Sequence, residues 1–161
     1  MRTSLFCFFV TAGLAMGQDN PFSAFNQRGF NQLRTWLLAS AEKMPEAEYA
    51  FRPAETVRTF GQVLGHVADE QYRFCSAVLE ETNPAPKIQQ TKTTKADLIP
   101  ALRDALAYCD KAYAATNDAA ASQTVKMFGG MPKPVVLTAN NMHLAEHYGN
   151  LVVYLRMKNV V

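Results

Sequence analysis

Residues 140–157 read NNMHLAEHYGNLVVYLRM, and this stretch decides the fold expected for the chain. His143 and His147 are four residues apart, so on a helix their side chains lie one above the other on the same face. Both imidazoles can then reach one metal ion, as paired helical histidines do for zinc. By itself the spacing favours two metal-free histidines over a metal site. A metal site therefore requires a further ligand, and the chain has one other histidine, His66.

The apolar residues of the chain recur mostly three and four positions apart, which is the period of an amphipathic helix. They predict helices over about 20–43, 59–82, 97–116 and 134–158. Strand-like alternation of any length is missing from the sequence. Four helices of several turns each are packed most simply as a bundle. We therefore expect an all-α fold, a four-helix bundle.

Capping residues place the starts of these helices. Asn20 precedes a proline, which is the usual order for a helix N-cap and first turn. Thr59 begins a capping box, with a glutamine three residues later. Either Thr94 or Asp97 caps the third helix, and Pro100 favours Asp97 because proline fits best in the first turn.

The length and composition indicate one folded domain. The chain has 161 residues, of which 48% are hydrophobic, and its formal net charge is +2. Its basic residues are scattered, so nucleic acid is not expected as a partner. No apolar run is long enough to span a bilayer. The expected partner is a small-molecule substrate of unknown identity, and a homodimer is left open.

The N-terminal segment has the pattern of an export signal. One basic residue is followed by an apolar run, and small residues then stand at the −3 and −1 positions before Gln18. We expect residues 1–17 to be a signal peptide and residues 18–161 to be the mature domain, located in a periplasm or secreted. Cys75 and Cys109 remain after cleavage. Two inert buried thiols are favoured, although an oxidising compartment would allow a disulfide if the geometry permits it.

Three segments together resemble the DinB/YfiT-like superfamily. They are TFGQVLGHV at 59–67, the pattern His143-x-x-x-His147-x-Gly149, and Tyr-Leu-Arg at 154–156. The resemblance covers nearly all of the mature chain. It implies a small four-helix bundle of the DinB/YfiT-like type, a metal-dependent enzyme in which one histidine of the second helix and the pair of the fourth helix bind a divalent metal.

The three expected metal ligands are therefore His66, His143 and His147. Three imidazoles and one open position suit a catalytic zinc ion, and Ni²⁺ is the alternative. The chain also departs from its relatives. Many of them have Arg-Gly-Gln after the second histidine of the pair, whereas this chain has Tyr-Gly-Asn at 148–150, which removes a cation.

The reaction that such a metal supports is less determined than the ligands. A metal-dependent hydrolase is the first hypothesis, with activated water and with Asp69 or Glu70 as general base. The same two residues and Glu146 are candidates to accept a hydrogen bond from the outer ring N–H of a metal-bound histidine. A metal-dependent thiol transferase is the second hypothesis. A non-catalytic metal-binding module of the cell envelope is the third.

Overall fold

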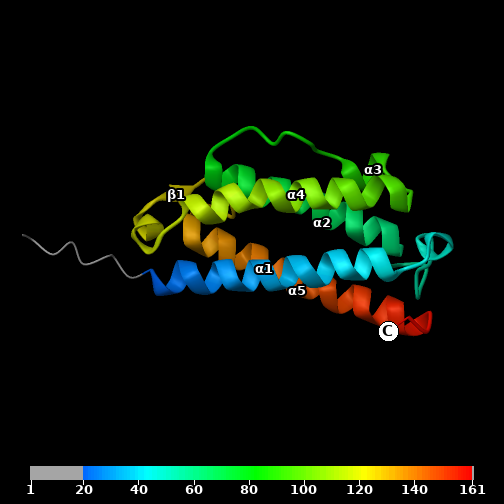
Figure 1. The fold of residues 1–161 in the computed structure, drawn as a ribbon. Coiled ribbons are helices and arrows are strands. Elements are labelled where there is room, and N and C mark those ends of the chain that lie inside the picture. The colour runs from blue at the N-terminus through cyan, green and yellow to red at the C-terminus, as the bar shows by residue number, and fades with distance from the viewer. Residues whose placement is uncertain (1–19, 161) are drawn as a thin grey trace, which may run out of the picture.

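The structure is a computed structural model that describes residues 20–160. Its four long helices are α1 (Pro21–Lys43), α2 (Phe60–Leu79), α4 (Lys95–Ala115) and α5 (Lys133–Met157). α1 and α5 run in one direction along the bundle, and α2 and α4 run in the other (Figure 1). The shorter elements are η1 (Glu46–Glu48), α3 (Ile88–Thr91), η2 (Asp118–Ser122), β1 (Thr124–Val125) and β2 (Met131–Pro132). The predicted four-helix bundle is confirmed.

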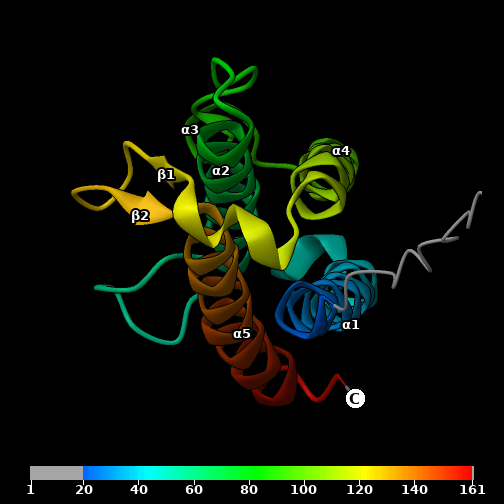
Figure 2. The ribbon, with the colours of Figure 1, turned by 90° about the vertical axis from the view of Figure 1, so that its left-hand side faces the viewer.

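Each long helix packs on two others. α1 contacts α4 and α5, and α2 contacts the same two helices. Viewed along the bundle, α2 therefore lies over α5, and α4 lies over α1 (Figure 2). Large apolar side chains from all four helices fill the space between them, and their removal from water is the main term that stabilises the fold. The most deeply buried include Phe30, Leu37, Phe60, Leu64, Leu102, Leu106, Leu144 and Leu151.

The first turn of α1 is capped from a distant part of the chain. Asn20 occupies the N-cap position, as predicted, but its side chain does not cap the helix. Its Oδ1 instead accepts the backbone N–H of Asp118 at 3.0 Å. The Asp118 carboxylate in turn accepts the backbone N–H groups of Phe22 and Ser23 at 3.2 and 2.7 Å. The hydrogen bond from the Ser23 hydroxyl is the main cause that lowers the pKa of Asp118.

The predicted capping box of α2 is confirmed, but the predicted start of α4 is wrong. Thr59 Oγ1 accepts the backbone N–H of Gln62 at 3.2 Å, and the glutamine side chain returns a bond to the Thr59 N–H at 2.9 Å. Thr94, rather than Asp97, caps α4 and accepts the Asp97 N–H. Pro100 therefore lies inside the helix. It is exposed there, so water can solvate the carbonyl group that its missing N–H leaves unpaired.

Cys75 and Cys109 form a disulfide, which corrects the expectation of two inert thiols. The bond joins α2 to α4 across the core, and both cysteines are fully buried. Their Cα atoms are 5.3 Å apart, which is within the normal range for a disulfide. Sequence spacing cannot reveal such a pair, because the two helices come together only when the bundle forms.

The long connection between α4 and α5 is folded rather than irregular. It contains η2 and the hairpin in which Val125 pairs with Met131. Gly129 and Gly130 at the tip have φ angles of +84° and +101°, which glycine adopts without strain. None of the helices within residues 20–160 is both long and apolar enough for a membrane span. The predicted signal peptide, residues 1–17, lies outside the described residues.

Candidate metal centre

The three histidines of the chain meet between α2 and α5. His66 comes from α2, and His143 and His147 come from successive turns of α5. The Nε2 atom of His143 is 3.1 Å from the Nε2 atom of His66 and 3.1 Å from that of His147. One ring nitrogen from each of the three residues lies within 4.8 Å of the other two. The predicted convergence is therefore present in the structure.

Close packing on α2 supports this arrangement. Gly65 precedes His66, and a Cβ atom at this glycine would lie 2.7 Å from the Cα of Gln89. Helix α3 can approach α2 only because this position lacks a side chain. The Asp69 carboxylate then holds the start of α3 by accepting the backbone N–H groups of Ile88 and Gln89 at 2.6 and 3.0 Å. The short helix is thus fixed against the same turn of α2 that carries the histidine.

The environment keeps the three imidazoles neutral. Burial lowers the pKa of His143 to about 3, and the nearby His147 and His66 add to this effect. Burial is also the main cause that lowers the pKa of His66 and of His147, and the positive charge of Arg58 acts in the same direction on both. A neutral imidazole retains the lone pair that binds a metal. The cluster is therefore in the protonation state that a metal site needs.

The geometry fits a divalent metal. Zn–N bonds of about 2.0–2.1 Å at tetrahedral angles separate two ligand nitrogens by roughly 3.3 Å, close to the two measured separations. With all three Nε2 lone pairs on one metal, the ring protons would lie on the Nδ1 atoms. The donor set of three imidazoles suits Zn²⁺, Ni²⁺, Cu²⁺ and Fe²⁺. Geometry and chemistry together allow a metal without deciding which one.

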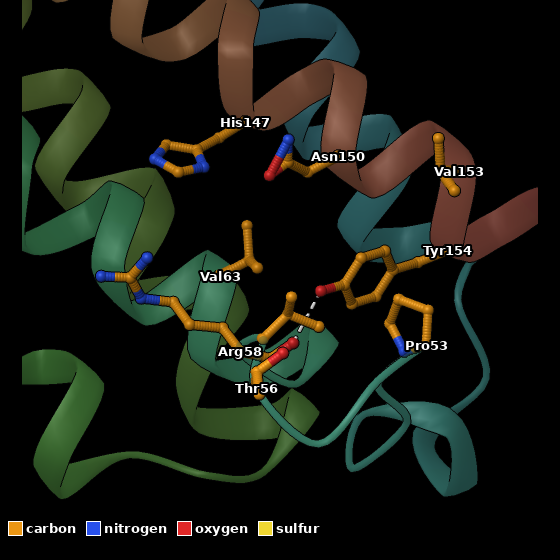
Figure 3. A pocket seen from close by; sticks show the side chains of 9 residues that line it. Pro53, Thr56, Arg58, Val63, His147, Asn150, Val153 and Tyr154 are labelled. Atoms are coloured by element: carbon orange, nitrogen blue, oxygen red, sulfur yellow. Dashed lines mark hydrogen bonds between the residues drawn. The ribbon is translucent and has the colours of Figure 1, made fainter.

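The outer nitrogens lack the partners expected of metal-binding histidines. The Nδ1 atoms of His143 and His147 are buried and have no hydrogen-bond partner. Glu146, one of the predicted acceptors, is exposed. The amide of Asn150 lies beside the ring of His147 (Figure 3) and acts to raise the pKa of this histidine, but it lies outside hydrogen-bond geometry with Nδ1. A ring nitrogen held without a partner has a free-energy cost, which a ligand on the other nitrogen would offset.

The two predicted general bases have different surroundings. Asp69 is committed to the start of α3 through both carboxylate oxygens. Glu70 lies one helical turn after His66, and its charge raises the pKa of both His66 and His147. Its carboxylate forms an ion pair with Arg73. Glu70 therefore affects the pKa of two histidines of the cluster, and its oxygens, unlike those of Asp69, accept no backbone hydrogen bonds.

A cavity of about 660 Å³ adjoins the cluster at His147. Figure 3 shows it between α5, the start of α2 and the connection that precedes α2. Its lining is mixed, with four apolar residues next to polar ones. The lining residues are Pro53, Thr56, Val57, Arg58, Val63, His147, Asn150, Val153 and Tyr154. A small organic molecule could therefore reach the histidines from this side.

The sequence did not identify Arg58 as part of the site. It stands just before the capping box of α2, and no motif singles it out. The Tyr154 hydroxyl donates a hydrogen bond of 2.7 Å to its carbonyl oxygen, which ties the connection to α5. The two residues that differ from the relatives' Arg-Gly-Gln pattern have different surroundings. Asn150 lines the cavity, whereas Tyr148 stacks on Trp36 of α1 with ring centroids 5.1 Å apart.

The fold and the three convergent histidines define a class, the small helical bundles with a candidate three-histidine metal centre. A family model described as the DinB superfamily matches residues 30–151. The chain therefore belongs to the DinB superfamily, and the predicted resemblance is confirmed. No curated protein was found to match the sequence.

Solved structures agree on the fold. A DinB-like protein from Bacillus cereus has a TM-score of 0.74 at 15% identity, covering 84% of this chain and 92% of its own. A DinB-like protein from Bacillus subtilis scores 0.69 at 18% identity, covering 85% and 94%. A mutant of a mycothiol-dependent maleylpyruvate isomerase scores 0.67 at 15% identity, covering 80% of this chain and 60% of that protein. At such low identity these likenesses show a shared fold.

Proposed function

We propose that this protein is an exported metal-dependent hydrolase in which His66, His143 and His147 hold a divalent metal, Zn²⁺ in preference to Ni²⁺. The observation that carries the proposal is the meeting of three neutral imidazoles beside a cavity of about 660 Å³. Bound there, a divalent metal supplies Lewis acidity, which lowers the pKa of water toward neutrality and polarises a carbonyl or phosphoryl oxygen.

The residues around the cluster have separate tasks in this proposal. The three histidines hold the metal through Nε2, and their neutral state needs no deprotonation before binding. Glu70 is the proposed general base, because it lies on the His66 face of α2 and its charge acts on two of the ligands. The apolar walls of the cavity exclude water from the body of the substrate. Asp69 fixes α3 and takes no part in proton transfer.

Export is supported by two independent features. The first 17 residues have the pattern of a signal peptide. The disulfide between Cys75 and Cys109 is of a kind that persists in oxidising compartments. N-terminal sequencing of the exported protein should begin at Gln18. Recovery of intact protein with Met1 from the cytoplasm alone would refute export.

The main test is metal analysis of protein purified without a metal-binding tag. The wild-type chain should retain about one metal ion, and His66→Ala, His143→Ala and His147→Ala should each lower the affinity by on the order of 100-fold or more, since each removes one of three ligands. Met142→Ala, an exposed residue next to His143 on α5, is the matched control and should retain the metal. Full metal loading of all three histidine variants would exclude the site.

Turnover separates hydrolysis from the other two functions. With 4-nitrophenyl acetate and bis(4-nitrophenyl) phosphate as probes, chelation should abolish hydrolysis while the melting temperature stays above the assay temperature. Unfolding on chelation, with no turnover of any probe by the metal-loaded protein, would favour a structural metal. Thiol transfer is the runner-up, because one structural neighbour is a mycothiol-dependent isomerase. It would show as metal-dependent consumption of a low-molecular-weight thiol together with an electrophile.

A further inference from the structure

The backbone of Arg58 is fixed at the edge of the cavity by its neighbours. Its carbonyl oxygen accepts the Tyr154 hydroxyl at 2.7 Å, and the next residue, Thr59, is the N-cap of α2. Both neighbouring anchors belong to long helices, so the Cα position is fixed relative to the histidine cluster. Figure 3 shows the arginine side chain extending from this point toward the end of the cavity where His147 lies.

The guanidinium of Arg58 has no ion-pair partner within residues 20–160. Ion pairs with acidic side chains are instead formed by Arg34, Arg73, Arg103, Lys133 and Lys158. Glu70, whose charge raises the pKa of His66 and of His147, is paired with Arg73. Arg73 in addition lies over the rings of Phe74 and Phe128. The charge of Arg73 is thus already paired, whereas the guanidinium of Arg58 is available to a ligand.

We propose that Arg58 binds the anionic group of the substrate, so that the cavity selects a small molecule with a carboxylate or phosphate on an apolar body. This inference rests on the proposed function for the position of the reacting group next to His147. The apolar body would lie against Val57, Val63 and Val153, which line the same cavity.

The chemistry of the side chain supports this assignment. A guanidinium presents parallel N–H donors that match the two oxygens of a carboxylate or phosphate, which makes arginine suited to anions. Its charge is felt at the metal site, because Arg58 contributes to the lowered pKa of all three histidines.

Binding to the metal-free protein tests the proposal without turnover. The probes are 3-phenylpropionate, benzylphosphonate and the neutral 3-phenylpropanamide, measured by calorimetry or protein NMR on the full mature chain. Wild-type protein should bind at least one anionic probe about tenfold more tightly than the amide, since one charge-assisted contact distinguishes them. Comparison of the two anions shows whether the site prefers a carboxylate or a phosphorus oxyanion.

Variants at two arginines of the same connection complete the experiment. Arg58→Gln should remove the preference for the anionic probes, and Arg58→Lys should retain part of it, because lysine keeps the charge but not the paired donors. Arg52→Gln is the matched control, since Arg52 is exposed and does not line the cavity. It should bind like the wild type.

Three results would overturn the assignment: a wild-type protein that binds the amide as well as the anions, an Arg58→Gln variant with an intact preference, or equal losses in Arg58→Gln and Arg52→Gln. Failure of the hydrolase proposal has a different signature. A metal-loaded protein without turnover would leave the binding preference of the metal-free protein unchanged.

Discussion

Two polar clusters lie close together along α2 and α5, one of them also including residues of α4, and they differ in how their hydrogen bonds are satisfied. The core polar cluster consists of Gln71, Asn140, Tyr113 and the Cys75–Cys109 disulfide. Gln71 and Asn140 are completely buried, and their amides exchange two hydrogen bonds of 2.8 and 3.1 Å. Asn140 also lies 3.3 Å from the Tyr113 hydroxyl. This cluster is complete without any ligand.

The histidine cluster contains buried ring nitrogens without a hydrogen-bond partner. Asn140 and His143 are three residues apart on α5, yet the amide is satisfied while the imidazole has a buried Nδ1 with no partner. The Nε2 atom of His143 also lies 3.1 Å from the Nε2 atom of each of the other two histidines. Buried polar groups are nearly always paired when their role is structural. The first cluster therefore stabilises the fold, whereas the second is a group of three histidines that could bind a metal.

The largest effect is expected from the disulfide of the core polar cluster. Replacing both cysteines, Cys75→Ala with Cys109→Ala, releases a link between residues 34 positions apart. Loop-closure entropy then predicts a loss of about 4 kcal/mol in the free energy of unfolding. Urea denaturation of the metal-free protein measures it. A loss below about 1 kcal/mol would show that the bond contributes little to this bundle.

A smaller loss is expected at the amide pair. Asn140→Leu leaves the Gln71 amide buried without its partner, so unfolding free energy should fall by about 2–3 kcal/mol. The double variant Gln71→Leu with Asn140→Leu should cost less than the single change, because no orphaned amide remains. A double variant that loses the sum of both single effects would contradict the structural role of the pair.

The smallest change, and one of opposite sign, is expected three residues further along α5. His143→Leu removes a buried nitrogen without a partner, so metal-free protein should keep its stability or gain about 1 kcal/mol. The same variant should lose metal. Denaturation of both proteins after chelation makes the comparison. If His143→Leu destabilised the protein as much as Asn140→Leu, the contrast between the two clusters would be lost.

Local patterns in the sequence predicted much of the fold. Helical periodicity placed the four long helices, and the capping box located the start of α2 at Thr59. The error at α4 came from giving Pro100 more weight than Thr94, although an exposed carbonyl can be solvated. The capping of α1 by Asp118 lay beyond such patterns, since the two partners are 95 residues apart.

The candidate site was predictable where it depends on residue type. Three histidines with one helical pair indicated the cluster, because few residues bind metals this way. Arg58 was not predictable, since arginine is common and its place in the cavity depends on packing. The hydrogen bond between the Asp69 carboxylate and the start of α3 was not predictable either, because α3 reaches Asp69 only after the chain has crossed back along the bundle (Figure 1).

The long-range cap of α1 has a consequence for how the chain is made. The ribosome releases α1 early, but the carboxylate that accepts the Phe22 and Ser23 amides belongs to residue 118. A nascent chain shorter than this carries a first helix whose leading amides are bound only by water. A proteolytic cut that displaced η2 would likewise fray the start of α1, although the two segments are far apart in the sequence.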